Sequence, residues 1–323
     1  MTSDEHFADA VVALAPRLGG PNGSISGLNR LSGGATQEIW RFDLGSEPLI
    51  LRRARGGDLV GDTGIGLEAE AELHVAVGAA NVPVPAVRYI LEADDDLGHG
   101  FIMAFVEGET LGGRIVKQEA SQPVGLARQC GEILARIHAI DPAPFPKIDY
   151  FSPADLVAYW QELYRATNWP RPVFEFALRW LDAHCPPPPA IPRLVHGDFR
   201  NGNLMVGPEG VRAVLDWELA HVGDPMEDLG WLCVNSWRFG AVDRPVGGFG
   251  GYDELFESYE RAGGDNIDRN AVKWWEVFGT LRWGIMCSGM AASFRDTDPT
   301  VERAMIARRT SETEIDLLRL LKD

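Results

Sequence analysis

Three short apolar runs within residues 193–215 are separated by polar loops, and this pattern constrains the fold more than any other part of the chain. Short apolar runs bounded by Gly and Asn predict strands joined by tight turns. The first loop carries the pattern His196-x-Asp198-x4-Asn203, and Asp216 directly follows the last run. Two carboxylates and one amide are therefore expected on rigid loops of a small β scaffold.

Phosphoryl transfer requires this set of groups. One carboxylate must accept the proton of the substrate hydroxyl, and oxygen ligands must hold Mg²⁺ against the nucleotide phosphates. The order along the chain predicts Asp198 as the catalytic base and Asn203 and Asp216 as the metal ligands. Asp and Asn are also common turn residues, which is the alternative explanation. The carboxylate of Asp216, in the expected order and spacing, favours catalysis.

Length and charge limit the class of protein. A chain of 323 residues suits two lobes better than one core. The formal net charge of −17 disfavours nucleic acid and anionic membranes as partners. The four cysteines lack zinc-ligand spacing, and the acidic N-terminus does not resemble a signal peptide. We expect a cytoplasmic protein that binds neither nucleic acid nor membrane.

The hydrophobic pattern changes near residue 106. Before this point, period-two runs predict short strands, and helical spacing predicts helices over 4–18 and 67–80, the second with Thr63 as its N-cap. The expected strands are 39–44, 48–53, 87–91 and 101–106. After this point the spacing is mostly helical, as in 123–140. The chain is therefore expected to be an α+β protein with domains 1–106 and 107–323.

The segments Leu194–Leu204 and Leu215–Glu218 resemble the aminoglycoside phosphotransferase and choline kinase-like superfamily. Gly223–Leu229 extends the resemblance, which covers roughly residues 28–235. The resemblance implies the bilobal protein-kinase fold, with a small β-rich lobe and a larger helical lobe. It also implies ATP and Mg²⁺ as cofactors and a hydroxylated small molecule as substrate. In such proteins the second aspartate of the last segment supports the catalytic loop, which implies that role for Asp228.

The resemblance further implies nucleotide contacts in the first lobe. The loop with Gly33 and Gly34 would cover the phosphates, since backbone N–H groups near glycine can approach phosphate closely. Backbone groups of Ala104 and Val106 would bind adenine. His138 also matches the superfamily and is expected to pack.

Protein kinases bind the phosphates with a strand lysine that pairs with a helix glutamate. This chain has no lysine in its first 116 residues, and the strand pattern places Arg52 at that position. A guanidinium can hold phosphate oxygens in bidentate fashion. Glu70 is the expected partner, with Glu68 and Glu72 as competitors, whereas Arg53 faces the opposite side of the strand.

Two branches of the superfamily compete as models for the substrate. One phosphorylates aminoglycosides, and the other resembles the kinase domain attached to some acyl-CoA dehydrogenases, which acts on hydroxyacyl thioesters. Leu51–Arg53, Val82–Pro85 and Leu215–Glu218 resemble the second branch more. The tryptophans of the C-terminal half would suit an acyl substrate, although core packing explains them equally well.

Two other functions are considered. A nucleotide-binding pseudokinase without turnover is the alternative suggested by the missing lysine. A protein kinase is disfavoured, because no Ala-Pro-Glu segment follows Asp216.

Overall fold

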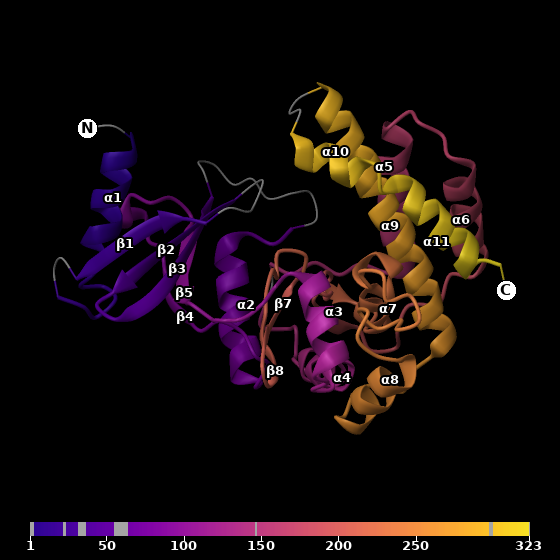
Figure 1. Ribbon diagram of the computed structural model, residues 1–323, viewed down its shortest axis with the longest axis horizontal. Helices are drawn as coiled ribbons and strands as arrows, with labels where there is room; N and C mark the ends of the chain where they lie inside the picture. The colour runs from indigo at the N-terminus through magenta and orange to yellow at the C-terminus, as the bar shows by residue number, and fades with distance from the viewer. Residues whose placement is uncertain are drawn as a thin grey trace.

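The computed structural model describes residues 3–21, 24–31, 37–54, 64–145, 147–296 and 300–322, which form a β-rich lobe followed by a helical lobe (Figure 1). The first lobe is a five-stranded antiparallel sheet with the strand order β1-β2-β3-β5-β4. Its elements are α1 (Ser3–Ala13), β1 (Ile25–Arg30), β2 (Gln37–Leu44), β3 (Glu47–Ala54), α2 (Leu67–Ala79), β4 (Val87–Ile90), the short 3₁₀ turn η1 (Ala93–Asp95) and β5 (Gly100–Ala104).

The central strand β3 is covered on both faces. Leu49 and Leu51 pack in one cluster with residues of α1, whereas Ile50 packs in a second cluster with Leu67 and Ala71 of α2. A strand buried on both faces shows a continuous apolar run rather than alternation, as this one does. Side chains alternate along a strand, so the next position on the α2 face is residue 52.

The second lobe contains most of the helices and two small antiparallel sheets, β6–β9 and β7–β8. Its elements are α3 (Gly112–Ser121), α4 (Leu126–His138), α5 (Pro153–Ala166), α6 (Pro172–Ala183), β6 (Arg193–Val195), β7 (Leu204–Gly207), β8 (Gly210–Val214), β9 (His221–Gly223), α7 (Met226–Cys233), the 3₁₀ turn η2 (Asn235–Trp237), α8 (Tyr252–Arg261), α9 (Arg269–Asp296), α10 (Val301–Ala307) and α11 (Thr310–Leu320).

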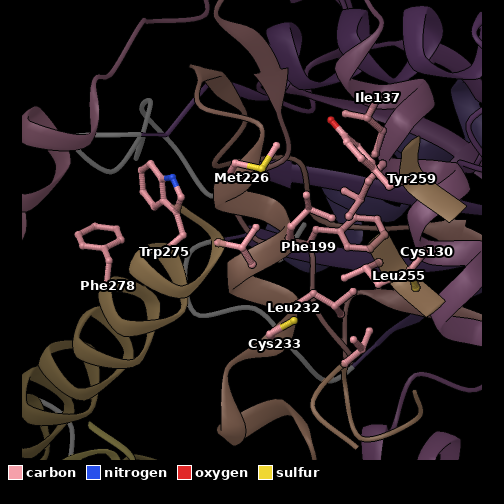
Figure 2. Packing of buried hydrophobic residues seen from close by; sticks show 14 of the residues in the cluster. Cys130, Ile137, Phe199, Met226, Leu232, Cys233, Leu255, Tyr259, Trp275 and Phe278 are labelled. Atoms are coloured by element: carbon pink, nitrogen blue, oxygen red, sulfur yellow. The ribbon is translucent and has the colours of Figure 1, made fainter. Parts of the chain in front are cut away.

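The core of the second lobe anchors the loop between β6 and β7. Phe199 of that loop is fully buried among side chains from α4, α7 and α8, such as Ile137, Met226 and Leu255 (Figure 2). Burying a phenylalanine stabilises the fold by roughly 1.5–3 kcal/mol. The loop that carries Asp198 is therefore fixed at its next residue by the main core.

Backbone hydrogen bonds join the two lobes directly. The Val214 N–H donates to the Pro83 carbonyl oxygen at 2.8 Å, and the Ile65 N–H donates to the Glu218 carbonyl oxygen at 2.8 Å. The extended Val82–Pro85 segment and the start of α2 thus lie against the β scaffold of the second lobe.

The expected bilobal α+β fold is confirmed, with differences at the ends of elements. The first helix ends at Ala13 rather than 18, because Pro16 cannot continue a helix. The last strand of the first sheet ends at Ala104, and β9 was not expected. Thr63 lies outside the described residues, and α2 begins after Gly66.

The domain boundary at residue 106 stays a prediction. It falls in the segment between β5 and α3, after the last strand of the five-stranded sheet. In the part of the chain that the structure describes, every helix is too short or too polar to cross a membrane.

Candidate active site

Asp228, in the first turn of α7, holds the backbone of the loop between β6 and β7. Its carboxylate is fully buried and accepts hydrogen bonds from the N–H groups of His196 (2.8 Å) and Gly197 (3.0 Å). His138 Nε2 lies 3.1 Å from the same carboxylate, and His138 Nδ1 contacts the hydroxyl of Tyr259 at 2.9 Å. The structure thus gives Asp228 the contacts of a loop support, and gives His138 a structural position behind it.

Burial alone would raise the pKa of the Asp228 carboxyl. The hydrogen bonds from His138 and from the loop backbone overcome this effect and lower its pKa. The charged form is therefore the one that the folded protein stabilises.

We expect Asp228→Ala to lower the free energy of unfolding by about 3–5 kcal/mol, because it leaves buried donors without an acceptor. The lowered pKa also implies that the stability due to this carboxylate is complete above about pH 4 and is lost as the pH falls further. Urea unfolding at pH 7 and at pH 3.5 measures both effects.

Asp94→Asn is the control, since this side chain is exposed, and it should change stability by less than about 0.5 kcal/mol. A change equally small for Asp228→Ala would contradict the supporting role.

Asp198 lies at the centre of a set of donors. Its Oδ1 accepts from Trp231 Nε1 at 2.7 Å and from Arg200 Nε at 3.0 Å, and its Oδ2 accepts from Asn203 Nδ2 at 2.6 Å. The side chain is 14% exposed, so it is mostly buried but still reaches solvent. A carboxylate fixed in this way is oriented to accept a proton from a neighbouring hydroxyl.

His196 shapes the loop rather than moving protons. Its Nδ1 accepts from the Asp198 N–H at 3.1 Å, and its Nε2–H donates to the Leu215 carbonyl oxygen at 3.1 Å. Burial lowers the pKa of this imidazole, despite nearby carboxylates that oppose the shift. The neutral ring therefore joins the loop to the end of β8, next to Asp216.

Asn203 and Asp216 lie near the point where the His196 ring joins the β6–β7 loop to the end of β8. The Leu215 N–H donates to the Asn203 carbonyl oxygen at 2.8 Å, which ties the two loops together. Because the Asn203 amide nitrogen donates to Asp198, its Oδ1 is the atom that could accept a cation. Asp216 has a left-handed backbone (φ 67°) and a side chain that is 39% exposed. Such a conformation costs non-glycine residues about 1–3 kcal/mol and is concentrated at functional sites.

Arg52 on β3 joins the two lobes electrostatically. Its Nη1 donates to Glu70 of α2 at 2.6 Å, and its Nη2 lies 3.5 Å from Asp216 Oδ1. Glu68 instead contacts surface groups, and Glu72 is exposed. The predicted Arg52–Glu70 pair is present, and the guanidinium lies beside the metal-ligand candidate.

Arg53 points to the other face of β3, as alternation predicted. It donates to Glu38 Oε2 at 2.8 Å, and its guanidinium lies 4.0 Å from the ring centroid of Phe7. This arginine belongs to the packing of α1 on the sheet.

Several carboxylates lie close enough to one another near Arg52 to shift the pKa of Glu218. Burial, together with the charges of Asp216 and Glu70, raises the pKa of Glu218 to about 7. Across the described residues, no cluster of three or more His, Cys, Asp or Glu side chains is arranged to hold a metal ion. A cation here would rely on one amide, one carboxylate and oxygens that a ligand supplies.

The expected adenine and phosphate contacts stay predictions. The Ala104 N–H donates to the Ala86 carbonyl oxygen at 2.9 Å, so its carbonyl is the backbone group that could meet adenine. Val106 follows in the segment that leads to α3, and its contact with adenine stays a prediction. Gly33 and Gly34 lie outside the described residues.

Sequence reasoning missed several residues of the site. Trp231 and Arg200 both donate to Asp198. Gln37 Oε1 accepts from Arg52 Nη2 at 2.8 Å. Arg282 Nη1 donates to the Gly197 carbonyl oxygen at 3.1 Å. Trp231 could have been found, since it lies three residues after Asp228 on the same helix face.

A sequence model described as the phosphotransferase enzyme family matches residues 27–264. Mouse acyl-CoA dehydrogenase family member 10 is 32% identical over 215 residues, which cover 62% of this chain and 20% of that protein. Chicken acyl-CoA dehydrogenase family member 11 is 28% identical over 226 residues, which cover 65% of this chain and 28% of that protein. The matched part thus spans less than a third of the length of these relatives.

Solved structures show the same fold. A candidate aminoglycoside phosphotransferase from Ralstonia eutropha superposes with a TM-score of 0.78 at 20% identity and covers 98% of both chains. Spectinomycin phosphotransferase, solved with ADP and spectinomycin, superposes with a TM-score of 0.68 at 14% identity. The superposition covers 97% of this chain and 98% of that protein. Aminoglycoside phosphotransferase APH(4)-Ia, solved with AMP-PNP and hygromycin B, gives 0.67 at 19% identity and covers 99% of both.

Proposed function

The chain belongs to the phosphotransferase enzyme family, and from this premise we propose that it is a kinase that phosphorylates a hydroxyl group of a small molecule, using ATP and Mg²⁺. The observation that carries the proposal is that Asn203 donates to Asp198, while the N–H of Leu215, the residue before Asp216, donates to the Asn203 carbonyl oxygen. Arg52 reaches this point from the other lobe. These are the parts that phosphoryl transfer uses for proton removal, metal binding and phosphate binding.

Asp198 is the proposed general base. As the substrate oxygen forms a bond to the γ-phosphorus, its proton passes to the Asp198 carboxylate, and the bond from phosphorus to the ADP oxygen breaks. The proton is later released to solvent, so the products are a phosphate ester, ADP and one proton. The donors on Asp198 keep the carboxylate oriented toward the hydroxyl throughout.

The residues present fit Mg²⁺. Asn203 Oδ1 and the partly exposed Asp216 carboxylate are hard oxygen ligands, and Mg²⁺ commonly takes one or two protein ligands together with substrate phosphates. Bound Mg²⁺ would neutralise the charge that develops on the phosphates. Asn203 would contribute twice, since its amide oxygen would face the cation while its amide nitrogen holds Asp198.

Arg52 is proposed to replace the usual lysine. We expect Arg52→Ala to raise the KM for ATP by about tenfold or more, since it removes a phosphate ligand and leaves the buried Glu70 carboxylate unpaired. Arg52→Lys should retain more affinity than Arg52→Ala, because an ammonium still supplies a point charge. Steady-state kinetics with varied ATP measure this.

Arg53→Ala is the matched control, because the neighbouring arginine lies on the opposite face of β3. It should leave the KM for ATP within about twofold. An equal effect of the two alanine variants would contradict the assignment of Arg52.

The surroundings of Asp198 favour an acyl substrate over an aminoglycoside. Trp231, Trp237 and Trp283 form a cluster separate from the main core, with Arg200 4.6 Å from the Trp237 ring and Arg282 4.6 Å from the Trp231 ring. Arg200, whose side chain is 26% exposed and contacts Asp198, would repel an aminoglycoside amine placed next to the base. We therefore propose a hydroxyacyl thioester, in accord with the acyl-CoA dehydrogenase names of the sequence relatives.

A screen of ATP consumption across aminoglycosides, amino alcohols and hydroxyacyl thioesters tests the proposal. Turnover that depends on a hydroxyacyl thioester is the expected result. Turnover with an aminoglycoside alone would overturn the substrate assignment. Binding of Mg-ATP without turnover on any acceptor would favour the pseudokinase instead.

A further inference from the structure

One helix, α7, contacts the catalytic loop at two points. Asp228 in its first turn accepts from the backbone N–H groups of His196 and Gly197, and Trp231, three residues later, donates its indole N–H to the side chain of Asp198. Residues three apart lie on one helix face. The same face therefore fixes both the backbone of the loop and its carboxylate.

The Trp231 ring is itself held in place. It is 3% exposed, the guanidinium of Arg282 lies 4.6 Å from its centroid, and the Trp237 ring packs edge-on at 5.2 Å. A Cβ atom on Gly279 of α9 would come within 2.8 Å of the ring, so the absence of a side chain there provides its space. A buried indole usually finds a partner for its N–H, and here the partner is the proposed base.

The donors on Asp198 are divided unequally between its two oxygens. Trp231 and Arg200 both bind Oδ1, whereas Asn203 binds Oδ2. A carboxylate offers about four lone-pair positions, two on each oxygen. The two donors fill the positions on Oδ1, and the vacant position is on Oδ2.

We infer that Trp231 is a positioning residue that fixes the carboxylate of Asp198 so that Oδ2 receives the proton of the substrate hydroxyl. This inference rests on the proposed function. Trp231 is suited to the task because it is a neutral donor on a rigid ring, so it orients the carboxylate without adding a positive charge. Without it, Arg200 alone would hold Oδ1, and the carboxylate could rotate.

The test compares Trp231→Phe with the wild-type enzyme on a hydroxylated acceptor. Misplacement of a catalytic group can cost up to about 100-fold in rate, so kcat should fall roughly 10- to 100-fold. The KM for ATP should stay within about twofold, since the ring does not contact Arg52 or Asp216. Replacing Trp231 with 3-benzothienylalanine, which keeps the ring shape and lacks the N–H, should lower kcat to the same extent.

Trp274→Phe is the matched control. Trp274 is equally buried, and its Nε1 donates to the Leu181 carbonyl oxygen at 3.0 Å, away from the catalytic loop. Its kcat should stay within about twofold of wild type. A Trp231→Phe enzyme with unchanged kcat, or an equal loss in the Trp274→Phe enzyme, would overturn the inference.

The contact can also be tested without turnover. Trp231→Phe identifies one of the ten indole N–H signals in a ¹⁵N-tryptophan NMR spectrum. That signal should lie downfield and should shift upfield in Asp198→Asn, and an unmoved signal would contradict the contact. A wild-type enzyme that transfers no phosphate would overturn the proposed function, and the positioning role with it, even if the NMR contact is present.

Discussion

Asp198→Asn is expected to lower kcat by about 10³-fold while Mg-ATP still binds. An amide cannot accept the hydroxyl proton, and general-base catalysis contributes roughly 10²- to 10⁴-fold in enzymes. The change preserves size and still offers an oxygen to Trp231 and Arg200. Single-turnover kinetics at saturating ATP measure the loss in the chemical step.

Calorimetry of Mg-ATP binding to the same variant is the internal control, and the affinity should change by less than about threefold. Phosphoryl transfer that stays within tenfold of wild type would contradict the assignment of Asp198 as the base.

Asp216→Ala is expected to weaken Mg-ATP binding by at least about 100-fold, which corresponds to ~2.8 kcal/mol. The variant removes the carboxylate that would hold the cation, and it also places alanine in a left-handed conformation. Asp216→Asn separates these effects, because asparagine tolerates that conformation but lacks the charge. Calorimetric titration with Mg-ATP measures both variants.

If Asp216 holds Mg²⁺, Asp216→Asn should resemble Asp216→Ala, and wild-type protein titrated with ATP in the presence of EDTA should lose most of its affinity. Unchanged affinity in either variant would contradict the metal role.

Some residues of the candidate site could be predicted from sequence, because short-range spacing along the chain brings them together. Asp198 and Asn203 share one loop, and Asp216 ends the hairpin that follows. Side-chain alternation along β3 predicted that Arg52 and Arg53 face opposite sides, and Glu70 of α2 does pair with Arg52. These relations depend on short-range spacing and on the family resemblance, which the match over residues 27–264 confirms.

Other parts of the site depend on contacts between distant segments, which spacing does not reveal. Gln37 of β2 contacts Arg52 of the neighbouring strand β3. Arg282 donates to the Gly197 carbonyl oxygen from a helix 85 positions later in the chain. Five tryptophans of the C-terminal half could not be told apart by sequence. In the structure Trp274 and Trp275 belong to the main core. Trp231, Trp237 and Trp283 form a separate cluster, from which Trp231 donates to Asp198.

The most direct test of the proposed function is ³¹P NMR of a reaction that contains the protein, Mg-ATP and a hydroxyacyl thioester. The proposed chemistry predicts a new phosphate monoester resonance that grows in step with ADP in the wild-type reaction and is missing with Asp198→Asn. Formation of ADP with inorganic phosphate alone, or equal ester formation by the variant, would contradict it.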